Sequence, residues 1–226
     1  MAELANKPAV TTRGTLYAMH TTSCSRRAIC ALVEAGVPFD YRPIDFAKRE
    51  QKELAFLEIQ PFGKVPAWVE RGGSDPFTLF ESRAIMRHVA DGSPLLPATA
   101  KGRALMDQWT SIEYSNFTPP FMPAYYDQLR RSLGAAPNLE AQAQAREGIT
   151  PTLDLMEHTL AESAFLAGES FSCADLTFLP LFEYLEVSGC GQLLESRPAV
   201  AAWWARCSAR ESWQYCVSGR VAERAV

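Results

Sequence analysis

Residues 91–97, Asp-Gly-Ser-Pro-Leu-Leu-Pro, divide the chain into two parts with different patterns. Two prolines and a glycine within seven residues cannot continue a helix. Before this segment short strand-like stretches alternate with helical ones, whereas beyond it the strand signals fade. The sequence therefore predicts an α/β unit at 15–91 and an all-α unit at 101–226. A linker at 92–100 joins them, and a flexible N-terminal extension covers 1–14.

The first unit has the order strand, helix, strand, helix, strand, strand, helix. Gly14 precedes the first apolar strand, and a cluster of Ser and Thr before the first helix is typical of a helix cap. Gly36 and Pro38 end that helix, and a segment from Pro61 to Pro66 interrupts the chain before the last two strands. The expected strands are 15–19, 39–46, 66–70 and 77–80, and the expected later helices are 50–59 and 81–90.

In the second unit the apolar residues recur at the spacing of a helix face, which predicts a helical bundle. The clearest sets are Leu105, Trp109 and Ile112; Ile149, Leu153, Met156 and Leu160; and Val200, Trp203, Trp204 and Cys207. Within the bundle, Ser172 and Asp175 match a capping box, in which a serine and a following acid satisfy the free amides at a helix start. We expect this pair to be structural.

Composition limits the partners. The chain of 226 residues is 47% hydrophobic, enough to fill real cores, and has a net charge of −4 with no basic stripe, so nucleic acid is not expected as a partner. No window approaches the roughly 18 apolar residues that span a bilayer, and the polar start does not resemble a signal peptide. We therefore expect a cytoplasmic protein with no membrane partner.

The six cysteines lack the CxxC and Cys/His spacings that are typical of metal sites. We expect free thiols in a reducing compartment and no bound metal. The cysteines are Cys24, Cys30, Cys173, Cys190, Cys207 and Cys216.

Two short segments suit the binding of a peptide with an anionic end. Pro66 enters a strand, where a cis bond would turn the Val65 amide and carbonyl outward for pairing with an added strand. Glu81 and Ser82 begin a helix, whose free amides and dipole favour a carboxylate, and a neighbouring acid favours an ammonium group. The alternatives are an ordinary trans proline in a turn and simple helix capping.

Thr22, Ser23 and Cys24 lie between the first strand and the first helix. A thiolate at such a helix N-terminus is stabilised by the dipole, by free amides and by a donated hydroxyl hydrogen bond, so its pKa falls. The alternative is a cluster that only caps the helix.

Taken together, residues 61–67 (PFGKVPA) and 79–85 (LFESRAI) resemble the glutathione transferase family, in the form closest to its phi class. Residues 164–176 (AFLAGESFSCADL) resemble the capping-box segment of the family's helical domain. The resemblance implies an α/β thioredoxin-like domain that binds glutathione, followed by a helical bundle that supplies the pocket for a second substrate. It also implies a homodimer, in which the thioredoxin-like domain of one subunit meets the helical domain of the other.

The implied glutathione-binding residues are Gln51, Lys52, Lys64, Val65, Pro66, Glu81 and Ser82. The first three contact the glycyl carboxylate in family members, and two lysines suit an anion. Val65, beside a cis Pro66, pairs with the cysteinyl backbone, while Glu81 and Ser82 hold the γ-glutamyl end. For the lysines, a solvated surface position is the alternative.

The thiol-activating position leaves three choices open. A gapless match over residues 16–27 places Thr22 where phi-class enzymes have a catalytic serine. The run Thr-Ser-Cys-Ser also resembles the Ser-Ser-Cys run of the zeta class, which makes Ser23 and Cys24 contributors. A slip of one residue favours Ser23, and a slip of two places Cys24 where beta-class enzymes have a cysteine. We rank Thr22 first, then Ser23, then Cys24.

We expect the second substrate to bind in an apolar cleft between the two domains. The candidate lining residues are Met19, His20, Tyr114, Phe117, Phe121, Tyr125 and Tyr126. Pro119, Pro120 and Pro123 are expected to break the helix there and open the pocket. Core packing is the alternative for each aromatic residue.

The predicted function is therefore a glutathione transferase that needs no metal or external redox cofactor and lets glutathione attack a small, apolar electrophile. Three alternatives stay open, because fold alone does not decide activity. They are a zeta-type isomerase, a thiol-disulfide reductase that uses Cys24, and a glutathione-binding protein without enzymatic activity. An isomerase acting on a diacid needs cationic groups in its pocket, whereas a conjugating enzyme needs an apolar one.

Overall fold

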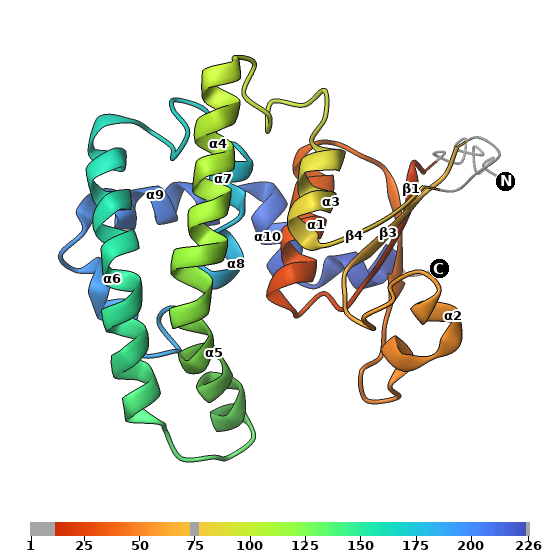
Figure 1. Ribbon diagram of the computed structural model, residues 1–226, viewed down its shortest axis with the longest axis horizontal. Coiled ribbons are helices and arrows are strands. Elements are labelled where there is room, and N and C mark those ends of the chain that lie inside the picture. The colour runs from red at the N-terminus through yellow and green to blue at the C-terminus, as the bar shows by residue number, and fades with distance from the viewer. Residues whose placement is uncertain (1–11, 73–76, 225–226) are drawn as a thin grey trace, which may run out of the picture.

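The computed structural model describes residues 12–72 and 77–224, so the predictions for residues 1–11 of the extension and for the end of the turn at 73–76 lie outside the described residues. The described chain forms an α/β unit with a mixed four-stranded sheet and a helical unit that packs beside it (Figure 1). The predicted fold class is confirmed, because a thioredoxin-like domain precedes a helical domain.

The sheet has the strand order β2-β1-β3-β4. Its strands are β1 (Gly14–Ala18), β2 (Phe39–Pro43), β3 (Ala67–Glu70) and β4 (Phe77–Phe80). β1 runs parallel to β2 and antiparallel to β3, and β3 runs antiparallel to β4. A parallel pair needs a crossover, which α1 (Ser23–Glu34) supplies. Gly14 has to be a glycine, because a Cβ there would lie 2.5 Å from the Trp68 ring.

α1 and α3 (Ser82–Val89) pack side by side between the sheet and the helical unit (Figure 1). The single helix predicted at 50–59 is instead a 3-10 turn, η1 (Glu50–Lys52), followed by the short helix α2 (Leu54–Leu57). The interruption lies at Glu53, whose extended backbone (φ −73°, ψ 145°) cannot belong to a helix. The second strand ends at Pro43 and is therefore shorter than the predicted 39–46.

The helical unit begins with α4 (Ala100–Ile112), the π-helical segment η2 (Glu113–Phe117) and α5 (Thr118–Ser132), which form one continuous column. α6 (Leu139–Glu162) packs along α5. The later elements are α7 (Cys173–Leu176), α8 (Leu179–Phe182), η3 (Gly191–Leu194), α9 (Pro198–Ser208), α10 (Glu211–Val217) and η4 (Arg220–Arg224). α10 returns to pack on α1, so the two units share one apolar core.

The expected helix break at the prolines is wrong. Pro119 and Pro120 lie in the first turn of α5, where a missing amide hydrogen needs no partner, and Pro123 lies inside the helix. The distortion falls just before them, in η2, where wider π-helical turns replace α-helical ones.

The capping box is confirmed. The Asp175 carboxylate accepts from the Ser172 amide at 3.0 Å, and the Ser172 hydroxyl caps the start of α7. Asp175 also accepts from the Leu166 amide and from the Trp203 indole, both at 2.9 Å. The carboxylate therefore ties α7 to the preceding loop and to α9.

Candidate active site

Thr22 is the N-cap of α1. Its Oγ1 accepts the Ser25 amide at 3.2 Å and lies 2.8 Å from Ser25 Oγ and 3.2 Å from the Met19 carbonyl. The hydroxyl therefore has a helix-capping role in the free protein, and the acceptance of a helix amide polarises its own O–H bond. Ser25, which the sequence interpretation did not select, is fully buried and fixes this arrangement.

Ser23 and Cys24 occupy the next two positions and are both partly exposed. Amides in the first turn of a helix have no intrahelical acceptor, so this turn presents both donors and the positive end of the dipole. All six cysteines lie in the described part of the chain, and Cys24 is the one that is not buried. Burial raises the pKa of the Cys30 and Cys173 thiols to about 12, which keeps them protonated.

The Val65–Pro66 bond is cis, as the sequence analysis predicted. Pro66 is buried at the entry to β3, while Val65 is partly exposed and packs against the buried cluster of Ile44, Phe56 and Ala67. The backbone before β3 is thus held in place by packing on an apolar cluster.

Glu81 and Ser82 form the start of α3. Glu81 has φ 70° and ψ 114°, a strained conformation for a residue with a side chain, and its exposed carboxylate makes no capping bond. Ser82 is 3% exposed, and its Oγ accepts from Arg27 Nη1 at 2.9 Å. Strain of this kind persists where the surrounding structure enforces it, which is common at binding sites.

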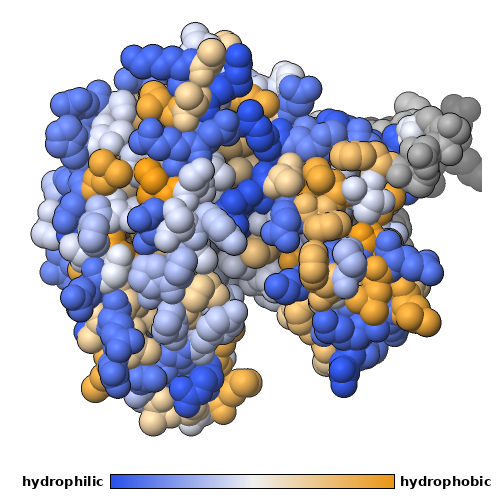
Figure 2. Space-filling view, in the orientation of Figure 1, coloured by the Kyte–Doolittle hydropathy of each residue, from blue (hydrophilic) through white to orange (hydrophobic). Residues whose placement is uncertain are grey.

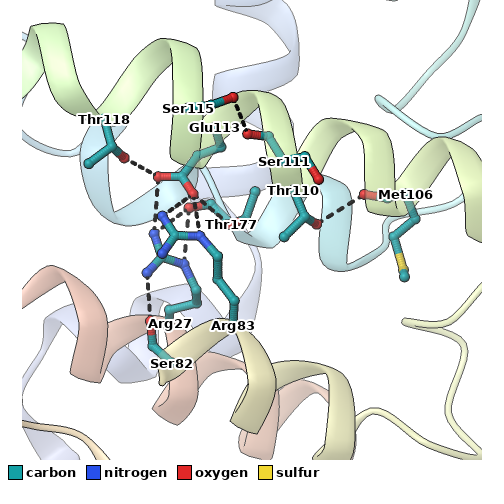
Figure 3. A network of polar contacts seen from close by, with 10 residues as sticks. All are labelled: Arg27, Ser82, Arg83, Met106, Thr110, Ser111, Glu113, Ser115, Thr118 and Thr177. Carbon is teal, nitrogen blue, oxygen red and sulfur yellow. Dashed lines mark hydrogen bonds and ion pairs between the residues drawn. The ribbon is translucent and has the colours of Figure 1, made fainter. Parts of the chain in front are cut away.

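A buried ion network crosses from the α/β unit to the helical unit (Figure 3). Glu113 of η2, with no exposed surface, binds the guanidinium groups of Arg27 and Arg83, the latter with its Nε at 2.8 Å. Its carboxylate also accepts from the Thr177 hydroxyl at 3.1 Å and from Thr118. Arg27 donates to the Thr177 carbonyl at 2.9 Å as well as to Ser82. The network therefore connects the start of α3 to two helices of the other unit.

Sequence reasoning selected Ser82 from this network and missed the other members. Arg83 lies inside the quoted Glu-Ser-Arg motif, so the signal was present without an obvious partner. Glu113 lies 30 residues from Arg83 and 64 residues from Thr177, and no local sequence pattern reveals contacts at such separations.

Gln51, Lys52 and Lys64 surround the loop that precedes the cis bond. Lys52 Nζ donates to the Phe62 carbonyl at 3.1 Å, and Lys64 is exposed. The Gln51 Oε1 atom is buried without a hydrogen-bond donor among the described residues. Two cations and an amide therefore gather where an anionic group can approach from solvent.

Two of the predicted pocket aromatics belong to the core instead. Phe117 and Phe121 are completely buried, and Phe117 stacks on Phe182 with a centroid distance of 5.8 Å. Core packing governs them because the Phe117 ring meets Phe178 and Phe182 at α8, and the Phe121 ring packs on Phe117. Their assignment to a pocket lining is corrected accordingly.

The other predicted aromatics lie nearer the surface. Tyr114 and Tyr126 are 64% and 57% exposed, and Arg83 lies over the Tyr114 ring at 4.8 Å. Tyr125 is largely buried, between Tyr126 and Tyr184, with its ring centroid 4.9 Å from that of Tyr184. Tyr184, which the sequence reasoning missed, donates its hydroxyl hydrogen to the Thr21 carbonyl at 3.2 Å.

Met19 and His20 are partly exposed in the loop between β1 and α1. The His20 amide donates to the Tyr41 hydroxyl at 3.2 Å, and its ring lies beside Gly219. Burial, reinforced by the nearby Arg26 charge, lowers the pKa of His20, so the ring is neutral at pH 7.

A cleft lies between the two units. Figure 2 shows it opening at the lower edge of the view, between the α5 end of the helical unit and the α2 side of the α/β unit. A separate cavity of about 930 Å³ lies between the C-terminal end of α1, β2 and α10, and is lined by residues such as Val33, Phe39 and Gln214. That cavity contains none of the predicted site residues. Among the described residues, no cluster of three or more His, Cys, Asp and Glu residues is arranged to hold a metal ion.

Comparisons with known proteins agree with this arrangement. Residues 12–91 match the model of the glutathione S-transferase N-terminal domain, and residues 115–211 match that of the C-terminal domain. Glutathione S-transferase F9 of Arabidopsis thaliana is 35% identical over 210 residues, which cover 90% of this chain and 95% of the relative. Glutathione S-transferase 3 of Zea mays is also 35% identical, with 90% of this chain and 92% of the relative covered.

Solved structures give the same picture. Glutathione transferase F2 from Populus trichocarpa has a TM-score of 0.83 at 34% identity, covering 92% of this chain and 99% of its own. The maize glutathione S-transferase I, solved in complex with an atrazine glutathione conjugate, has a TM-score of 0.82 at 29% identity and covers 92% of this chain and 97% of its own.

Proposed function

The chain belongs to the glutathione S-transferase family, and we propose that the first turn of its helix α1 stabilises the thiolate of glutathione for attack on a small, largely apolar electrophile. It is an enzyme that transfers glutathione to electrophiles, as its relatives of the plant phi class are. The single observation that carries the proposed mechanism is the position of Thr22, whose hydroxyl caps the start of α1.

In the proposed binding mode, glutathione lies along the edge of the sheet before β3. The Val65 backbone pairs with the cysteinyl residue as an added strand. The Ser82 hydroxyl, which Arg27 already fixes, and the first amides of α3 hold the γ-glutamyl carboxylate, while the exposed Glu81 carboxylate attracts the ammonium group.

The other end of glutathione requires a second anion site. Gln51, Lys52 and Lys64 supply it for the glycyl carboxylate, because the two exposed lysines provide charge and the side-chain NH2 of Gln51 is a hydrogen-bond donor. With both ends held, the sulfur reaches the first turn of α1.

Thr22 Oγ1 then donates its hydrogen to the sulfur, and the free amides and dipole of α1 favour the anion. The cap bond from the Ser25 amide stays in place during this change, because the hydroxyl oxygen accepts one bond while its hydrogen turns. The lowered thiol pKa increases the fraction of nucleophile at neutral pH, and the proton leaves to solvent. The thiolate attacks the electrophilic carbon, a C–S bond forms, and the leaving group departs with its electron pair.

A second candidate activity rests on the exposure of Cys24. In thiol-disulfide exchange, the Cys24 thiolate attacks a mixed disulfide of glutathione, releases the other thiol and becomes glutathionylated itself. A second glutathione thiolate then releases oxidised glutathione and restores Cys24. Transferase activity is the first choice because it needs only the hydroxyl of Thr22 and the helix start.

Kinetics on four variants tests the mechanism. Purified Thr22→Ala, Thr22→Ser, Ser23→Ala and Cys24→Ala proteins are compared with the wild type using chlorodinitrobenzene and a glutathione mixed disulfide. The proposal expects conjugation to be lost in Thr22→Ala and kept in the other three. Loss of disulfide reduction in Cys24→Ala with conjugation intact would establish the second activity. Full conjugation by Thr22→Ala would overturn the role given to Thr22.

We also propose that the enzyme is a homodimer with two sites. Large apolar side chains on the α/β unit are exposed, including Phe62 at 60% and Phe77 at 48%, and these are suited to burial against the helical unit of a second copy. Light scattering on the wild type and on Phe62→Ser tests this arrangement. A monomeric wild-type protein at micromolar concentration would contradict it.

The predicted compartment and domain limits complete the proposal. Six free cysteines support a reducing, cytoplasmic location, and no described helix is long and apolar enough to cross a bilayer. We keep the thioredoxin-like domain at 15–91, the linker at 92–100 and the helical domain at 101–226, which limited proteolysis followed by mass spectrometry tests.

A further inference from the structure

Arg26 carries a positive charge without an acidic partner among the described residues. Its Nε donates weakly to the His20 carbonyl at 3.4 Å, and its guanidinium lies over the Tyr184 ring at 5.5 Å from the centroid. The nearby acid Glu183 accepts from the Trp213 indole at 3.3 Å and forms no ion pair with Arg26 in the described part of the chain, while Arg26 also hydrogen bonds with the Tyr184 side chain. A half-buried cation with one carbonyl and one aromatic face keeps donors available for an anion.

Most arginines of the fold differ from Arg26 in this respect. The arginines that form an ion pair with a carboxylate are Arg13, Arg27, Arg71, Arg83, Arg87, Arg130, Arg131, Arg197 and Arg210. Arg42 is an exposed arginine on the edge strand β2, and it serves below as the control for removal of one positive charge.

The Arg26 charge lies beside the thiol-activating turn. Tyr184 connects it to that turn through the hydrogen bond to the Thr21 carbonyl, and Tyr125 packs on Tyr184. Burial raises the pKa of Tyr125 to about 12, while the Arg26 charge opposes that shift and Cys24 adds to it. Arg26 and Cys24 are therefore both near Tyr125 of α5.

We propose that the second substrate is an apolar or aromatic electrophile that carries a carboxylate, and that Arg26 determines this specificity. The inference rests on the proposed function and names the substrate class of the same site. The tyrosine rings contact the apolar body of the substrate, and the guanidinium binds its carboxylate at the edge of the rings. The carboxylate does not react: the C–S bond forms at the activated carbon, and the leaving group departs as before.

A matched pair of substrates tests the inference in the full-length enzyme. Chlorodinitrobenzoate and its methyl ester have the same reacting carbon and differ in charge, and each rate is divided by the uncatalysed rate. The measured quantity is the ratio of kcat/KM for the acid to that for the ester. Arg26→Met is expected to lower this ratio about tenfold, mainly through KM of the acid, because one charge-assisted contact is lost.

Two further variants separate recognition from folding. Arg26→Lys keeps the charge and should restore part of the ratio, whereas Arg42→Met removes an exposed charge at the sheet edge and should leave the ratio unchanged. An unchanged ratio in Arg26→Met, or an equal fall in Arg42→Met, would overturn the inference. If the wild type turns over neither compound, the proposed function fails instead. If it turns over the ester but not the acid, only the inference fails.

Discussion

The Thr22 hydroxyl has one hydrogen to donate and three neighbouring groups within hydrogen-bonding distance. It accepts the Ser25 amide, and it lies within reach of the Ser25 hydroxyl and the Met19 carbonyl. An arriving thiolate is a better acceptor than either neutral oxygen, because hydrogen bonds to ionised groups are about twice as strong as neutral ones. The same atom therefore stabilises the free helix and the bound sulfur.

Thr22→Ala separates these two roles. Loss of the cap should lower the free energy of unfolding by about 1 kcal/mol. Loss of the donor should lower kcat/KM for conjugation by a factor on the order of 100. Thr22→Ser should keep both values near the wild type. Chemical denaturation and steady-state kinetics on the three proteins measure the two effects. If Thr22→Ala is less stable than the wild type but keeps its conjugating activity, the role of Thr22 is limited to capping.

Glu81 combines a strained backbone with a proposed role in glutathione binding. Its backbone lies in a region that residues with a side chain rarely adopt, and its exposed carboxylate does not cap α3. Glu81→Gly should raise the free energy of unfolding by about 1 kcal/mol, because glycine adopts this backbone without strain. The same change should weaken glutathione binding about tenfold through the lost carboxylate. Calorimetric titration and denaturation check the pair of effects. Tighter or unchanged glutathione binding would contradict the assigned role.

At the scale of the elements, the start of α3 is held by a network rather than by its own cap. Arg27 of α1 fixes Ser82, and Glu113 of η2 forms an ion pair with Arg27 and another with Arg83. Because these charges are buried, removing one leaves the others without a partner. The glutathione-binding end of α3 is therefore coupled to a helix of the other unit.

Glu113→Gln tests this coupling. The variant should lose about 3 kcal/mol of unfolding free energy, since Arg27 and Arg83 both lose their carboxylate partner while Arg27 stays buried. Glutathione should also bind more weakly, because Ser82 loses its fixed position. Asp107→Asn is the matched control, because its ion pair with Arg87 is exposed and should contribute less than about 1 kcal/mol. Equal losses in the two variants would show that burial of the network has no special effect.

The contact between β3 and α3 has a defined pH dependence. Burial opposes ionisation of Glu70, but hydrogen bonds from His88, Arg13 and Trp68 outweigh it and lower the pKa to about 2 from an ordinary 4.5. A lowered carboxyl pKa stabilises the folded state above pH 4.5, and that contribution is lost as the pH falls toward 2.

Glu70→Gln should therefore be less stable than the wild type at pH 7, and the difference should shrink as the pH is lowered below 4.5. Urea denaturation at a series of pH values measures the difference. A difference in unfolding free energy between the two proteins that stays constant down to pH 3 would contradict the lowered pKa of Glu70.

At the scale of the whole molecule, local patterns predicted the order of elements, and distant contacts decided the rest. The helix break at residues 91–97 and the order of strands and helices along the chain follow from proline, glycine and apolar spacing, whereas the cis bond at Pro66 was implied by the family resemblance. Phe117 and Phe121 were misplaced, because helical spacing does not reveal which neighbour a ring meets. Glu113 was missed for the same reason, since its partners come from both units.

The candidate site was predicted in the same uneven way. Thr22 and Ser82 could be found because each lies at a helix start, where chemistry and capping use the same residue types. Arg26 and Tyr184 could not, because 163 residues separate Tyr184 from the turn that it contacts. The sequence thus indicates where glutathione binds more readily than what the second substrate is.

The most direct test of this account is the pKa of the glutathione thiol in the complex, followed through the ultraviolet absorbance of the bound thiolate as the pH is raised. The account predicts that the thiol bound to the wild type titrates one or more units below free glutathione, and that Thr22→Ala moves it back toward the free value. A bound thiol that titrates like free glutathione, or one whose pKa is the same in the wild type and Thr22→Ala, would contradict the role of the α1 start.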